Sequence, residues 1–107
     1  MRLTELEPYW VALSDTPGVR KRGEPLTFES AQGIMFLCPV CFAKNGGPIG
    51  TEHVLVWFAG HGVPDDAVPG PDRWVATGTD FDDLSLTPSI NVNHEHWHGF
   101  ITGGEVR

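Results

Sequence analysis

The two cysteines of the chain, Cys38 and Cys41, are separated by two residues in the stretch CPVC. Two thiolates at this spacing on a tight turn can both bind one tetrahedral Zn²⁺ at about 2.3 Å. A disulfide is disfavoured because the N-terminal residues show no secretion signal, and thiols stay reduced in the cytoplasm. A thioredoxin-type redox pair requires a strand followed by a helix, whereas the residues after the pair, FAKNGG, favour a turn. The pair therefore predicts half of a zinc site.

The other half of this site is expected from histidines, because the chain has no further cysteine. His94, His96 and His98 occupy alternate positions in the stretch NHEHWHGF. In an extended strand these three side chains point to one face, and Glu95 and Trp97 point to the other. A set of two cysteines and two histidines suits Zn²⁺ better than Mg²⁺ or Ca²⁺, which prefer oxygen ligands. We expect His96 and His98 to complete the site, with His94 as the alternative.

Other interpretations of the histidines remain open. The histidine-rich stretch can be a polar strand face without metal, and His53 could also reach an ion bound by the cysteines. His61 lies in an expected loop and is assigned no role. A site with three protein ligands and a bound water would instead indicate a small zinc-dependent hydrolase, with Glu95 as general base. The zinc protease and zinc deaminase motifs are both missing, so a non-enzymatic protein is the favoured expectation.

The rest of the sequence predicts a mainly β protein. Thirteen glycines and nine prolines favour short strands and turns over long helices. We expect an edge strand in the stretch 3–13, a hairpin of LTFES and GIMFLC, and a loop in SDTPGVRKRGEP and in 59–71. The remaining strands are expected in HVLVWF, RWVATG, PSINV, WHGFIT and EVR. Together these segments predict a single zinc-stabilised domain over residues 1–107, with an antiparallel sheet arranged as a sandwich or a partly open barrel.

The charge distribution restricts the classes of partner. The formal net charge is −7, and residues 45–107 carry all of it. Six aspartates between positions 65 and 83 surround a single arginine, Arg73. Such a surface repels nucleic acids and suits a basic protein partner or simple solubility. Nucleic acid is therefore not an expected partner. No stretch is apolar enough to span a bilayer, so a membrane is not an expected partner either. The cytoplasm is the expected compartment.

Several stretches resemble a small family of bacteriophage and prophage proteins without an established function. They are FLCPVCFAKNGGPIGT, VPDDAVPGPDRWVATGT, DDLSLTPSI and WHGFITGGEV, and the resemblance extends from about Leu3 to Val106. It implies a zinc-binding β domain in the cytoplasm of a bacterial host, with Cys38, Cys41 and His98 as ligands and a host protein as the partner. Members often have a cysteine shortly before the Trp-His-Gly segment, where this chain has His94 and His96 instead. Some members are labelled ammonia monooxygenase, a membrane copper enzyme for which this chain has no matching residues.

Overall fold

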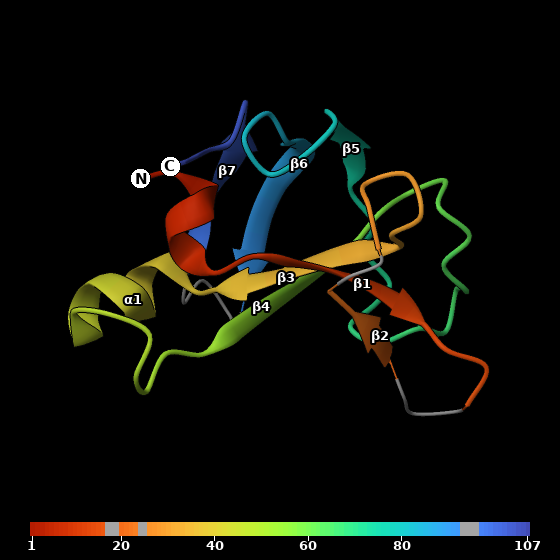
Figure 1. Ribbon diagram of the computed structural model, residues 1–107, viewed down its shortest axis with the longest axis horizontal. Coiled ribbons are helices and arrows are strands. Elements are labelled where there is room, and N and C mark those ends of the chain that lie inside the picture. The colour runs from red at the N-terminus through yellow and green to blue at the C-terminus, as the bar shows by residue number, and fades with distance from the viewer. Residues whose placement is uncertain (17–19, 24–25, 93–96) are drawn as a thin grey trace.

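The computed structural model describes residues 1–107 with the exception of 17–19, 24–25 and 93–96 (Figure 1). Within that part, eight strands form two four-stranded antiparallel sheets, and the only helices are one short α-helix and one 3-10 turn. The elements are η1 (Leu3–Leu6), β1 (Tyr9–Leu13), β2 (Arg20–Arg22), β3 (Gly33–Leu37), α1 (Pro39–Asn45), β4 (His53–Trp57), β5 (Val75–Thr77), β6 (Ser85–Val92), β7 (Trp97–Thr102) and β8 (Glu105–Val106). The mainly β fold with antiparallel sheets is therefore confirmed.

The two sheets face each other across one hydrophobic core. The first has the strand order β2-β1-β3-β4 and the second β5-β6-β7-β8. Figure 1 shows β6 running at a steep angle to β3 and β4, above them in this view. The core contains side chains from both sheets, and the rings of Phe36 in β3 and Trp97 in β7 meet edge to face with centroids 5.9 Å apart. This arrangement is a sandwich whose layers are joined mainly by apolar contact.

The loop after β4 covers the outer face of the first sheet. The indole N–H of Trp57 donates to the Val68 carbonyl at 3.0 Å, and the Trp57 ring lies directly over Gly33. A side chain at position 33 would collide with this ring, so the close approach requires glycine. The Arg73 guanidinium holds the loop by hydrogen bonds to four backbone carbonyls, those of Pro64, Ala67, Pro69 and Asp72. The expectation of a loop over 59–71 is confirmed, and this loop is internally bonded.

Three expectations about the N-terminal third were wrong. The stretch 3–13 is a 3-10 turn followed by a strand that lies between β2 and β3, so it is not at the edge of a sheet. The edge strand is β2, in residues expected to be loop. The stretch LTFES is a turn, because Thr27 and Ser30 bond to each other's backbone amides and the Ala31 amide donates to the Thr27 carbonyl. Such local hydrogen bonds compete with strand pairing.

The strand expectations for the rest of the chain were better. HVLVWF, RWVATG, WHGFIT and EVR each contain a strand, and PSINV belongs to a longer strand that begins at Ser85. The stretch after Cys38 was expected to be a turn, but it forms α1. Pro39 at the first helical position and Gly46 in a left-handed conformation after the last suit the two ends of a helix.

The residues before β6 form a turn organised by one carboxylate. The Asp83 carboxylate accepts hydrogen bonds from the Thr79 and Asp80 amides, each at 2.9 Å, and from the Thr79 hydroxyl at 2.8 Å. The backbone N–H of Thr79 contributes most to holding the pKa of Asp83 below its ordinary value, and the Asp80 N–H is next. The charged carboxylate is thus preferred in the folded chain.

This preference predicts a pH-dependent stability at acidic pH. A carboxyl whose pKa is lower in the folded chain stabilises the fold above its unfolded-state pKa, and that contribution disappears as the pH falls through the folded-state pKa. We expect Asp83→Asn to be less stable than the unchanged chain at pH 7, and the difference to shrink below about pH 4. Urea unfolding at several pH values measures this difference. Asp66→Asn, at an exposed loop position, is the control, and an equal effect of both substitutions would contradict the prediction.

Candidate functional site

The two cysteines lie at the junction between β3 and α1. Cys38 follows the last residue of β3, and its amide donates to the Glu52 carbonyl at 2.8 Å, which continues the pairing with β4. Its own carbonyl accepts the Phe42 amide at 2.8 Å, so it begins the helix. Cys41 is in the first turn of α1. The helix therefore brings both thiols to one corner of the core, as a shared metal ion would require.

Neither cysteine forms a disulfide, and both are buried. Cys38 is 1% exposed and Cys41 is 9% exposed, and both belong to the hydrophobic core. Burial raises the pKa of the Cys38 thiol, the backbone amides of Cys41 and Val40 act in the opposite direction, and the nearby Cys41 thiol raises it further. Redox-active thiols normally have a lowered pKa. Without a cation the protonated, inert form of Cys38 is therefore favoured, whereas a bound metal ion would compensate the charge of its thiolate.

The context of the cysteine pair differs from the expectation. A redox pair was disfavoured because no strand-to-helix transition was expected, yet β3 runs directly into α1 at Cys38. That objection was wrong. The direction of the Cys38 pKa shift is now the physical argument against a reactive thiolate at this position.

His98 lies away from the cysteines, on the outer face of the second sheet. It is exposed, and its Nε2 is 3.0 Å from the Ser89 hydroxyl oxygen. The preceding residue, Trp97, is 6% exposed and points into the core. The expected alternation of Trp97 and His98 between opposite faces is confirmed. The Trp97 ring packs on Phe36.

The remaining expected ligands are only partly covered by the structure. Among the residues that it describes, no three His, Cys, Asp or Glu side chains form a group that could hold a metal ion. His94 and His96, together with Glu95, lie outside the described residues. His53 is exposed at the start of β4, where it pairs with Leu37, and its ring lies 6.4 Å from that of Tyr9. The half-site of Cys38 and Cys41 is thus the part of the expected centre that the geometry describes.

Comparison with protein-family models, curated proteins and solved structures found no match. No helix in the described part of the chain has the length and apolar character needed to cross a bilayer.

The sequence interpretation missed the part that His61 plays in the structure. Its Nδ1 lies 2.7 Å from the Ala31 carbonyl oxygen, and its ring meets those of Phe28 and Phe58 edge to face at 5.7 and 5.2 Å. Gln32 adds hydrogen bonds to the carbonyls of His61 and Gly62. Only the contact partners reveal this role, because a histidine between two glycines in a loop resembles an ordinary polar loop residue. His61 attaches the 59–73 loop to the end of the 27–32 turn.

We expect His61→Ala to lower the free energy of unfolding by about 1–2 kcal/mol, because one partly buried hydrogen bond and two ring contacts are lost. Urea denaturation followed by far-ultraviolet circular dichroism measures the change. Asp66→Ala in the same loop is exposed and is expected to change the stability by less than about 0.5 kcal/mol. Equal stability of His61→Ala and the unchanged chain would contradict the assignment.

Proposed function

We propose that this chain is a non-enzymatic, phage-type accessory protein, a structural zinc module that acts by binding a protein partner. Cys38 and Cys41 supply two zinc ligands, and two of His94, His96 and His98 supply the others. The observation that carries the proposal is the burial of both cysteines, neither in a disulfide, at one corner of the core, with backbone amides beside the Cys38 sulfur. Two thiols on a turn of this kind suit a tetrahedral ion.

The packing of the sheets favours ligands from the segment between β6 and β7. Trp97 follows that segment directly, and its ring contacts Phe36, two residues before Cys38. The start of β7 and the residues just before Cys38 are therefore close to each other in space. His98 faces the outer surface and contacts Ser89, whereas both cysteines belong to the core. On this geometry we favour His94 and His96 over His98, which differs from the preference that strand alternation alone suggested.

A structural ion would add stability where a small domain needs it. Structural zinc contributes on the order of 10 kcal/mol to small domains, which is comparable to the whole stability of a typical domain. In this chain it would join the β3–α1 junction to the start of β7. The proposed role is thus to hold the two layers of the sandwich together at one end.

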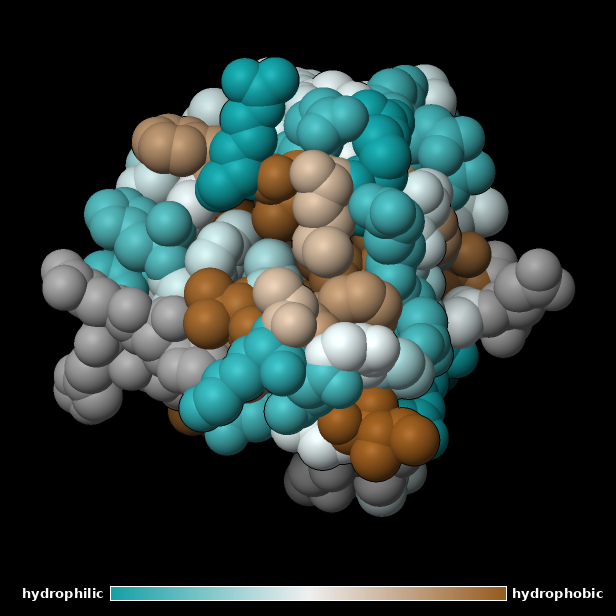
Figure 2. Space-filling view, turned by 90° about the vertical axis from the view of Figure 1, so that its left-hand side faces the viewer, coloured by the Kyte–Doolittle hydropathy of each residue, from teal (hydrophilic) through white to brown (hydrophobic). Residues whose placement is uncertain are grey.

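The surface of the chain supports a protein partner rather than a nucleic acid. Asp65, Asp66, Asp72 and Asp82 are exposed on the 59–73 loop and the 79–83 turn. Figure 2, which looks at the end of the molecule where α1 lies, shows apolar side chains at the surface. Val40 in α1 is 42% exposed and Ile49 in the following turn is 90% exposed. An acidic region and exposed apolar side chains suit a partner with basic and apolar residues.

Metal analysis and melting curves test the zinc proposal. We expect about one Zn²⁺ per chain, and we expect EDTA or Cys38→Ser to lower the transition temperature by more than about 20 °C or to abolish folding. His94→Ala and His96→Ala should each weaken zinc binding at least about tenfold, with His98→Ala as the matched control that leaves it unchanged. An unchanged transition temperature after EDTA has removed the metal would contradict a structural role for zinc.

Coordination separates this proposal from the zinc hydrolase. X-ray absorption is expected to show a sphere of two sulfur and two nitrogen atoms, all from the protein. Two sulfurs with one nitrogen and one water oxygen would instead favour an open, catalytic site. A disulfide-linked, metal-free chain isolated under reducing conditions would contradict both.

Partner binding is tested by capture from bacterial lysate with the immobilised chain. We expect a bound host protein that is lost with Asp82→Lys, because charge reversal weakens contact with a basic surface. Capture of nothing, or capture unchanged by the reversal, would contradict binding through the acidic region.

A further inference from the structure

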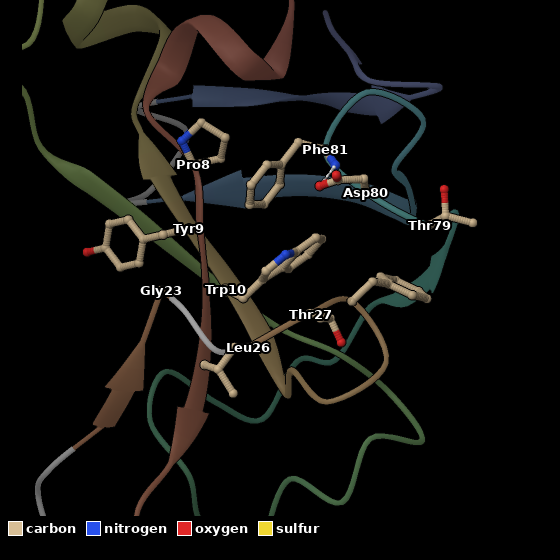
Figure 3. Close-up of a pocket in the computed structure, with 10 residues that line it drawn as sticks. Pro8, Tyr9, Trp10, Gly23, Leu26, Thr27, Thr79, Asp80 and Phe81 are labelled. Carbon is tan, nitrogen blue, oxygen red and sulfur yellow. Dashed lines mark hydrogen bonds between the residues drawn. The ribbon is translucent and has the colours of Figure 1, made fainter.

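A cavity of about 470 Å³ lies beside the start of β1, away from the cysteines. Among the described residues it is lined by β1, by the stretch 26–28 and by the 79–81 turn, and Figure 3 shows the side chains that surround it. Small-molecule sites in proteins usually measure about 300–1,000 Å³. The cavity is therefore large enough for a small organic ligand.

Aromatic rings form much of its wall. Trp10 and Phe81 are stacked with centroids 4.3 Å apart and planes inclined by 24°, and Phe28 meets Trp10 edge to face at 5.9 Å. Trp10 is 6% exposed, yet no described residue accepts a hydrogen bond from its indole N–H. The indole N–H groups of Trp57 and Trp74, by contrast, donate to backbone carbonyls. Among the described residues, the indole N–H of Trp10 thus has no acceptor.

Among the described residues that line the cavity, the charged one is acidic. Asp80 lines the cavity, and Figure 3 shows its carboxylate bent back toward Phe81, whose amide N–H donates to Oδ1 at 2.8 Å. Within the described chain, Asp80 forms no ion pair, and no basic side chain lines the cavity. Asp82 and Asp83 follow in the same turn, and residues 45–107 carry the net charge of −7. The rim therefore attracts cations, and the aromatic wall offers them cation–π contacts.

We propose that this cavity binds an alkylated ammonium group, with aromatic contacts from Trp10, Phe28 and Phe81 and charge compensation from Asp80. Aromatic walls with a nearby carboxylate suit such cations because the alkyl groups are apolar while the charge is retained. The indole N–H of Trp10, from which no described residue accepts a hydrogen bond, suits an oxygen atom carried next to the ammonium group. The ammonium group can belong to a free small molecule or to an alkylated lysine side chain. None of these residues belongs to the proposed zinc site, so each proposal can fail without the other.

Titration with tetramethylammonium and choline, followed by ¹⁵N–¹H correlation spectra, tests the proposal. We expect the indole resonance of Trp10 to shift while those of Trp57 and Trp74 stay unchanged, because the latter two are bonded elsewhere. The neutral isostere of choline, 3,3-dimethylbutan-1-ol, should bind at least about fivefold more weakly. Equal binding of choline and its neutral isostere, or no shift with either cation, would overturn the proposal.

Two variants check the residues. Asp80→Asn should weaken choline binding at least about fivefold, and Phe81→Leu, which keeps apolar volume but removes the ring, about threefold or more. Asp66→Asn removes one negative charge elsewhere on the surface and should change binding less than about twofold. Asp80 is exposed, so its substitution is compatible with folding. Unchanged binding by Asp80→Asn, or an equal loss with Asp66→Asn, would refute the site.

A further titration distinguishes a free ammonium compound from an alkylated lysine side chain. It compares a short peptide that contains trimethyl-lysine with the same peptide that contains unmodified lysine. Tighter binding of the trimethyl-lysine peptide than of choline assigns the cavity to a modified protein, and the reverse assigns it to a free ammonium compound. Equal binding of the modified and unmodified peptides, together with no binding of choline, would refute recognition of the alkylated group.

Discussion

The burial of one apolar layer between two small sheets is the constraint on which the rest of the structure depends. The first sheet uses residues from the first half of the chain, and the second uses residues from the last third. The apolar face of each sheet is therefore covered by a distant part of the chain. Phe36 and Trp97 meet across this layer. Because Cys38 lies two residues after Phe36, the same contact determines where the cysteine pair sits relative to the start of β7. The proposed metal centre would thus reinforce a contact that already exists.

The parts of the fold that could be predicted are those where side-chain pattern decides the structure. HVLVWF is a run of β-branched and aromatic residues, and WHGFIT alternates buried and exposed side chains, as the structure confirms. The prediction failed where local hydrogen bonds or pairing partners decide. Thr27 and Ser30 make a turn of a stretch with strand composition, and Arg20–Arg22 is a strand because β1 offers it an open edge. Pro8 precedes β1, so it does not interrupt pairing inside the sheet.

The candidate site also has features that follow from local sequence and features that do not. The spacing of Cys38 and Cys41 keeps the two residues close to each other in the chain, which is a local property. The conformation of that turn was not predicted, since Pro39 and Gly46 acting as helix boundaries were less evident than the glycines that follow. The cavity beside Trp10 was also missed. Its wall combines rings from positions 10, 28 and 81, and no pattern along the chain relates positions so far apart.

Hydrogen bonds join residues 1–3 to residues 104–106. The Leu3 amide donates to the Gly104 carbonyl, the Val106 amide donates to the Met1 carbonyl, and the Arg2 side chain reaches Glu105 and the Asp82 carbonyl. Leu3 and Leu6, which are fully buried, therefore depend for this attachment on residues that the ribosome adds about a hundred positions later. We expect folding to finish only after synthesis has passed Val106, so during translation these leucines would be available to chaperones that bind exposed apolar segments.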